Sequence, residues 1–152
     1  MDLLALDEDA RATVIKHWGR ELGFDDVGIA SPGPHPEMAR FAEWLERGYH
    51  GTMQYMVRHR RRREQPERAL PRIASVIVAA LDYDTERPRS TEVALKEGQG
   101  WISRYAWGAD YHEVIEPKLD RWVERLTAAA PGHRFLRYVD HGPVLEKVFG
   151  RH

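Results

Sequence analysis

The chain has 152 residues, about the length of one ordinary domain, so we expect a single unit over residues 1–152. Lys and Arg number 23 against 24 Asp and Glu, and this balance excludes a global field that attracts nucleic acid or an anionic membrane. The absence of Cys excludes disulfides, thiolate zinc sites, a Cys nucleophile and iron–sulfur ligation from within these residues.

The first half of the sequence predicts three helices and one strand. Apolar residues recur at helical spacing over 11–22 and again over 38–48, and Gly follows each pattern where a helix ends. Between them, residues 24–30 form a short apolar run before a Gly- and Pro-rich loop, which is typical of a strand. A third, short helix is expected over residues 52–63, ending before Pro66.

The second half predicts a buried strand, a loop and a longer helix. Residues 74–83 are continuously apolar and β-branched, so we expect a strand covered on both faces, with the core there. Residues 84–100 are charged and punctuated by Gly and Pro, which indicates a mobile surface loop. A helical face follows over 115–126, with Pro117 as a kink or a late start.

The sequence closes with a predicted strand over residues 133–140 and the beginning of a helix over 142–150. No internal repeat interrupts the interleaved strands and helices. The expected fold class is therefore α+β, or α/β-like, with a mixed sheet flanked by helices and an incomplete final element. The N-terminus is acidic where a secretory signal is basic, and no apolar run reaches the ~18 residues that span a bilayer. We expect a cytoplasmic protein that does not enter a membrane.

Residues 58–63 form the densest basic cluster, Arg-His-Arg-Arg-Arg-Arg. This cluster suits a phosphate-binding edge, and equally a solvated helix end at which cations oppose the helix dipole. The second interpretation is the more common one for a charge run. Arg63 lies just before the predicted buried strand, where its side chain can reach the end of the sheet and hold phosphate or amide oxygens of a ligand.

Two short segments carry the other candidate site residues. Asp110 and Glu113 fit a capping box, which leaves His112 unexplained. Asp110, His112, Asp140 and His141 offer metal-ligand chemistry, the basis for a metal-dependent hydrolase as a minor alternative. They lack the i, i+4 His spacing of the common zinc motif, so the sequence assigns no metal ligand.

Asp140 ends the last predicted strand, a position where α/β folds often place ligand sites. The alternative is an Asp that bonds its own backbone in a turn ahead of Pro143. Composition does not separate these two interpretations.

Five ordered segments resemble the N-terminal half of the epoxyqueuosine reductase family: LGFDDVGIA, FAEWLERGYHGTMQYMVRH, RREQPERALPRIASVIVAALDY, ISRYAWGADYHEVI and YVDHGPVLEK. This family resemblance implies a cobalamin-binding domain similar to flavin nitroreductases. It also implies reduction of the epoxide of epoxyqueuosine in tRNA. Two four-iron four-sulfur clusters and tRNA-binding helical repeats are expected in a part beyond residue 152.

The resemblance also implies which residues contact the cofactor. It carries cobalamin binding onto Arg63, Ser103 and Asp140, and onto four further residues of the wall around the cofactor, Arg104, Tyr105, Asp110 and His112. Asp140 matches the family's proton donor, and a carboxyl group needs a raised pKa to donate a proton at neutral pH.

The leading hypothesis is the cobalamin-binding part of an epoxyqueuosine reductase, truncated or completed by an iron–sulfur domain in trans. Its partner is tRNA with epoxyqueuosine at the wobble position. The alternative is a non-enzymatic cobalamin- or tRNA-binding module without the redox half.

Overall fold

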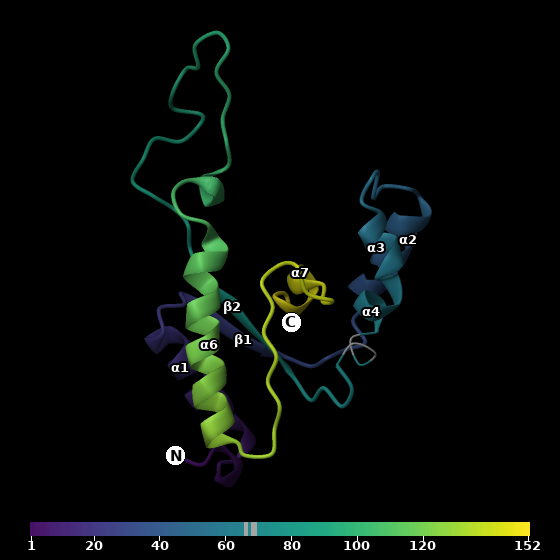
Figure 1. Cartoon of the computed structure of the whole chain (residues 1–152), viewed down its shortest axis with the longest axis vertical. Helices are drawn as coiled ribbons and strands as arrows, with labels where there is room; N and C mark the ends of the chain where they lie inside the picture. Colours follow the sequence, from purple (N-terminus) through teal and green to yellow (C-terminus); the bar gives the residue numbers. More distant parts are fainter. Residues whose placement is uncertain (66, 68–69) are drawn as a thin grey trace.

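The structure is a computed structural model that describes residues 1–65, 67 and 70–152. It is a mixed α+β fold with a small sheet, and Figure 1 shows the arrangement. In chain order the described elements are η1 (Leu3–Ala5), α1 (Glu8–Glu21), β1 (Asp26–Ala30), α2 (Glu37–Glu46), α3 (Gln54–Arg58), α4 (Arg60–Glu64), β2 (Val76–Ala80), η2 (Arg104–Ala106), α6 (Tyr111–Ala129) and α7 (Glu146–Phe149).

The sheet consists of β1 and β2, which pair antiparallel with Val27 opposite Ala79 and Ala30 opposite Val76. Helix α1 packs against β1 and α6, and α7 packs against β2. Helices α2, α3 and α4 form a separate group on the other side of α7 from α6 (Figure 1). Within the described residues, no helix is both long and apolar enough to cross a bilayer.

The main core lies where α1, β1 and α6 meet. The rings of Phe24 and Trp122 lie 5.7 Å apart, and Trp18, Val27 and Leu126 complete the buried centre. Full burial of one such side chain stabilises the fold by about 1.5–3 kcal/mol. Trp18, Trp122 and Leu126 come from the apolar faces of α1 and α6, which helical periodicity in the sequence identifies, whereas Phe24 and Val27 come from the start of β1 and the residues before it.

Both faces of β2 are covered, as predicted, with Ile77 and Ala79 packed against the main core, but the prediction that the core is centred on this strand is wrong. Residues Val76–Val78 are only partly buried, and the exposed Ala80 closes the strand. A sheet of two strands gives β2 one neighbour, so its apolar side chains are shielded less than those of a central strand. On the other face of the strand, Val76 and Val78 pack against a second, smaller buried cluster of Ala30, Met38 and Phe149.

The predicted last strand is also wrong. Residues 133–140 contain no strand, although their sequence alternates as a strand does. Figure 1 shows this segment running as an extended stretch along α6. Alternation specifies which side chains share a face, but a strand forms only when a neighbouring strand supplies the hydrogen bonds.

The helix predictions hold in type and shift at their ends. Helix α6 begins at Tyr111, so Pro117 lies inside it and does not start it. At Pro117 the helix lacks the backbone hydrogen bond that a Pro nitrogen cannot donate. The expected helix over 52–63 is divided at His59 into α3 and α4. Pro66, its expected stop, lies outside the described residues.

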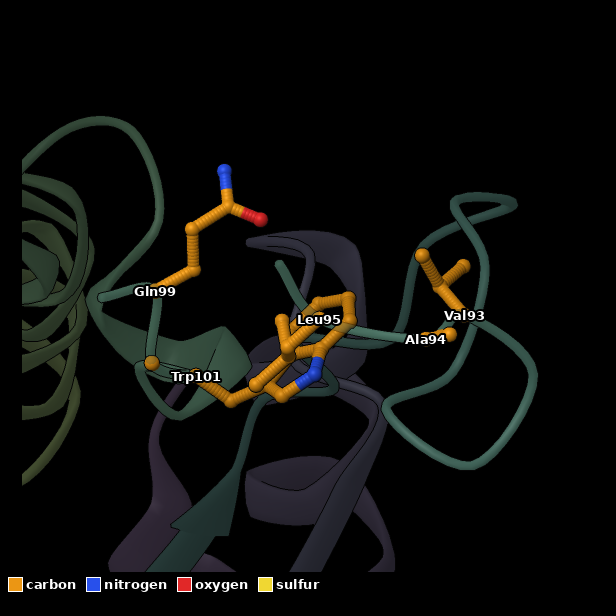
Figure 2. Close-up of a pocket in the computed structure, with 6 residues that line it drawn as sticks. Val93, Ala94, Leu95, Gln99 and Trp101 are labelled. Carbon is orange, nitrogen blue, oxygen red and sulfur yellow. The ribbon is translucent and has the colours of Figure 1, made fainter. Parts of the chain in front are cut away.

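The loop predicted over residues 84–100 contains neither helix nor strand. It protrudes from the body of the molecule (Figure 1) and encloses an open pocket of about 390 Å³ between Val93 and Trp101 (Figure 2). Apolar side chains, Gln99 and Gly100 line this pocket, with no group that titrates near neutral pH. We therefore place the candidate site elsewhere.

Candidate functional site

Asp140 lies on a tight turn that follows the extended segment. Its φ of 47° is in the left-handed region, which Asp tolerates better than most residues. Its backbone N–H donates to Glu146 Oε1 at 2.7 Å. A Cβ at Gly142 would lie 2.5 Å from Tyr138 Cγ, so only Gly fits this close approach. The turn directs the Asp140 carboxylate toward α6.

The first turn of α6 supplies the groups that face Asp140. Asp110 caps the helix, with its Oδ1 accepting from the His112 backbone N–H at 2.9 Å and contacting His112 Nδ1 at 2.8 Å. This confirms the Asp110 half of the predicted capping box. Capping also fixes the orientation of the two side chains that follow, Tyr111 and His112.

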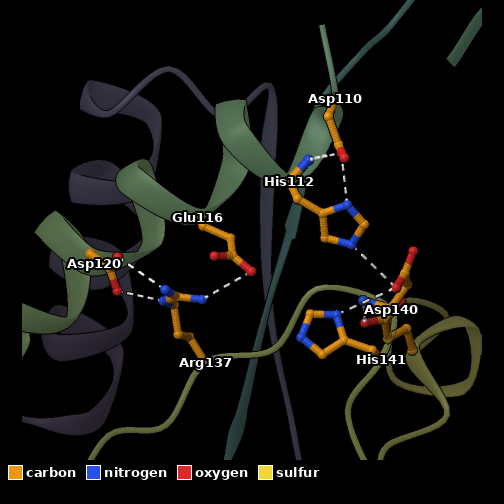
Figure 3. A network of polar contacts seen from close by, with 8 residues as sticks. Asp110, His112, Glu116, Asp120, Arg137, Asp140 and His141 are labelled. Atoms are coloured by element: carbon orange, nitrogen blue, oxygen red, sulfur yellow. Dashed lines mark hydrogen bonds and ion pairs between the residues drawn. The ribbon is translucent and has the colours of Figure 1, made fainter. Parts of the chain in front are cut away.

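The Asp140 carboxylate is the meeting point of these side chains (Figure 3). Its Oδ2 accepts a hydrogen bond from the Tyr111 hydroxyl. Its Oδ1 lies 3.5 Å from His112 Nε2 and 3.6 Å from His141 Nδ1. The observed contacts of the carboxylate are thus with side chains, which differs from the self-bonded turn of the sequence-based alternative.

These contacts set the protonation of the group. The Tyr111 hydrogen bond lowers the pKa of Asp140, with a further contribution from His112. The same bond raises the pKa of Tyr111 to about 12. Asp110, and then Asp140, raise the pKa of His112. The pKa of Asp140 is lowered in the chain by itself, because half of the side chain is exposed and a hydrogen bond stabilises its ionised form. The expectation that a bound corrin and substrate raise this pKa stays a prediction.

Arg63 reaches the same turn from α4. It is buried, so the interpretation as a solvated helix end is wrong for this residue. Its Nη1 donates to the Val144 carbonyl at 3.2 Å, and its buried Nε has no hydrogen-bond partner among the described residues. Nearby Glu146 has a pKa raised by burial, which the positive charge of Arg63 partly opposes.

The remaining predicted residues are divided between the site and the loop. The Tyr105 ring lies 5.9 Å from the Tyr111 ring, edge to face, and so belongs to the site. Arg104 forms an ion pair with Asp84 and donates to the Arg87 carbonyl at 2.8 Å. Its guanidinium is therefore held by the base of the loop. The Ser103 carbonyl accepts from the Ala106 N–H at 3.0 Å.

Sequence reasoning missed two members of the site, Tyr111 and Glu146. Tyr111 stands between two residues that were identified, and its role depends on the direction in which α6 starts. Glu146 is part of the quoted YVDHGPVLEK segment, but nothing in the sequence pattern shows that its carboxylate accepts a hydrogen bond from the Asp140 backbone N–H.

A second polar network holds the extended segment in place. Arg137 pairs with Asp120 and lies 3.4 Å from Glu116 Oε1, both on α6 (Figure 3). It sits three residues before Asp140, so this pairing helps to fix where the Asp140 turn begins.

A groove of about 950 Å³ lies between β2, α6 and the extended segment. Apolar side chains such as Ile77, Leu119 and Phe135 line most of it, and Tyr111, Asp140 and Glu146 line it as well. Asp140 is the one predicted site residue among its lining groups. The site thus combines a polar centre, formed by Asp140 with Tyr111, His112 and His141, with the apolar groove beside it.

Comparison with known proteins gives consistent similarities. The family model described as epoxyqueuosine reductase QueG, DUF1730, matches residues 63–141. An epoxyqueuosine reductase of Pseudomonas aeruginosa is 40% identical over 148 residues, which cover 97% of this chain and 41% of that protein. The Escherichia coli epoxyqueuosine reductase is 33% identical over 142 residues, which cover 93% of this chain and 38% of that protein.

Structural comparison agrees with the sequence comparison. The solved structure of epoxyqueuosine reductase from Streptococcus thermophilus superimposes with a TM-score of 0.67 at 21% identity, over 88% of this chain and 35% of that chain. This likeness shows the fold. The chain spans about two-fifths of the length of the curated relatives that it matches.

Proposed function

Since the chain belongs to the epoxyqueuosine reductase family, we propose that it forms the cobalamin-binding part of an enzyme that reduces the epoxide of epoxyqueuosine in tRNA to queuosine. The observation that carries the proposal beyond the family name is the position of Asp140. Side chains from two segments far apart in the sequence, Tyr111 and His112 at the start of α6 and His141 in the turn, converge on its carboxylate.

The residues around this carboxylate fit a corrin. Cobalamin is a flat macrocycle edged with amides, so its site needs apolar surface and polar groups at the rim. The Tyr105 ring is 52% exposed and lies 5.9 Å from the ring of Tyr111, and apolar side chains line most of the groove that Asp140 also lines. The buried Arg63 Nε has no hydrogen-bond partner in the part of the chain that the structure describes, and it can donate to an amide oxygen of a ligand.

In this proposal Arg63, Ser103, Tyr105, Asp110 and His112 hold the cofactor, with Arg104 contributing through the loop base that it anchors. Bound cobalamin supplies a strongly reducing, nucleophilic cobalt centre. The electrons come from two four-iron four-sulfur clusters in a part of the enzyme outside these 152 residues.

The side chains of the chain itself handle protons. Conversion of an epoxide to an alkene and water consumes two electrons and two protons. The Tyr111 hydroxyl and His112 hold protons on either side of the Asp140 carboxylate. A cofactor and a substrate that exclude water raise the pKa of Asp140, so that it takes up a proton from His112 and donates it to the epoxide oxygen.

The proposed macromolecular partner is tRNA. The net charge of −1 requires a local contact, and the exposed Arg58, Arg61 and Arg62 of α3 and α4 offer one to backbone phosphates. Arg60 is less available because it pairs with Glu46 and Glu64.

The Asp140→Asn substitution tests the proposed chemistry. Asn preserves size and hydrogen bonding but cannot donate a carboxylic proton. In a chimera of this chain with the remainder of the Pseudomonas aeruginosa relative, turnover of epoxyqueuosine should fall by ~10²–10⁴-fold, the usual contribution of a positioned general acid. Mass spectrometry of digested tRNA measures the product. Unchanged turnover would remove Asp140 from the reaction and leave it a structural role in the turn.

A further inference from the structure

Three metal-binding groups converge at the start of α6. His112, Asp140 and His141 each offer one ligand atom, and these atoms all lie within 4.8 Å of one another. Asp140 Oδ1 is central, at 3.5 Å from His112 Nε2 and 3.6 Å from His141 Nδ1. Two imidazoles and one carboxylate are ligands that Zn²⁺ favours, and sites with three protein ligands keep a fourth position open.

The surrounding contacts orient two of the three ligands. Asp110 Oδ1 lies 2.8 Å from His112 Nδ1, and a proton on Nδ1 leaves the Nε2 lone pair directed toward Asp140. The Tyr111 hydroxyl donates to Asp140 Oδ2, which leaves Oδ1 on the side of the two histidines. Carboxylates bonded to a ligating His, and donors bonded to a ligating carboxylate, are the usual outer partners of a metal site.

The ligands are also accessible. The side chains of His112, Asp140 and His141 are 31%, 51% and 61% exposed, so an ion can enter without displacing packed residues. The sequence offers these residues but does not show that they meet, because His112 belongs to α6 while Asp140 and His141 belong to the turn. Spacing along one helix therefore gives no zinc motif.

We propose that His112, Asp140 and His141 bind a divalent transition metal ion, with Asp110 and Tyr111 holding the first two ligands in position. This site goes beyond the proposed function, since it uses only side chains of this chain and needs no cobalamin. A bound ion engages Asp140 Oδ1, so metal binding and proton transfer by this carboxylate exclude each other.

Calorimetric titration of the 152-residue chain with Zn²⁺, and a visible-absorbance titration with Co²⁺, test the proposal. One ion should bind per chain, and the Co²⁺ complex should show the intense bands of a tetrahedral site. His112→Gln and His141→Gln should each remove this binding. Asp110→Asn should weaken it by about 10–100-fold, the usual effect of losing an outer partner. His59→Gln, at an exposed His of the α3–α4 junction, is the matched control and should bind as the parent does.

Circular dichroism establishes that each variant remains folded before it is titrated. A parent chain that binds no Zn²⁺ would overturn the proposal. So would equal affinities for the His112→Gln and His59→Gln variants, because the ion would then be held elsewhere. None of these results depends on cobalamin, so failure of the metal site leaves the proposed function intact.

Discussion

Gly19→Ala should destabilise the fold, against the general preference of helices for Ala. In an open helix interior this change gains about 1 kcal/mol. Gly19 is buried in α1, however, and an added Cβ would lie 2.6 Å from Trp122 Cη2 and 2.7 Å from Val27 Cγ2. Trp122 cannot move away easily, since Phe24 packs beside it. Extra methyl groups in a filled core cost about 1–3 kcal/mol.

Both contacts are far below van der Waals separation, so we take the upper end of that cost and expect a net loss of about 2 kcal/mol. For a domain of this size the loss lowers the Tm by roughly 4–8 °C. Urea denaturation followed by Trp fluorescence measures the free energy of unfolding. Gly28→Ala in β1 is the control, because no atom lies within 4 Å of its added Cβ. If Gly19→Ala raised stability as an exposed helix position does, the packing of α1 on α6 would be incorrectly described.

Three further predictions concern other contacts. Arg137 lowers the pKa of Asp120, so this pair stabilises the fold above the pKa that Asp has in the unfolded chain and ceases to do so as the pH falls through the folded value. Arg137→Gln should therefore lower the Tm at neutral pH but not near pH 2, and an equal effect at both would contradict the ion pair. Ultraviolet titration should show one tyrosine ionising near pH 12, and Asp140→Asn should bring it back toward ordinary values; an unchanged curve would argue against the Tyr111 hydrogen bond. Leu126→Ala should cost about 2–5 kcal/mol in urea denaturation, and a loss below 1 kcal/mol would mean that Leu126 is not in the core.

Local patterns in the sequence predicted the helices better than the sheet. The apolar faces of α1 and α6 follow from helical periodicity, and both helices pack through those faces. A strand depends on a partner elsewhere in the chain, which periodicity does not supply. This is why residues 133–140 alternate as a strand does and yet remain unpaired.

The sequence predicted which residues form the site better than it predicted their pKa values. Asp110, His112 and Asp140 were all identified and lie together in the structure. Arg104 belongs to the same quoted segment, but its long side chain turns to Asp84, a contact that the sequence does not specify. The lowered pKa of Asp140 depends on the Tyr111 hydroxyl, whose position is fixed only once α6 and the turn are packed.

The central claim is that this chain binds cobalamin. The direct test is a titration of the 152-residue chain into cobalamin, followed through the visible spectrum of the corrin. We expect a saturable spectral change at one cobalamin per chain, weakened by Arg63→Ala and unchanged by Arg62→Ala, its exposed neighbour. Circular dichroism confirms that both variants are folded. A folded chain that leaves the spectrum unchanged would show that these residues do not form a cobalamin site.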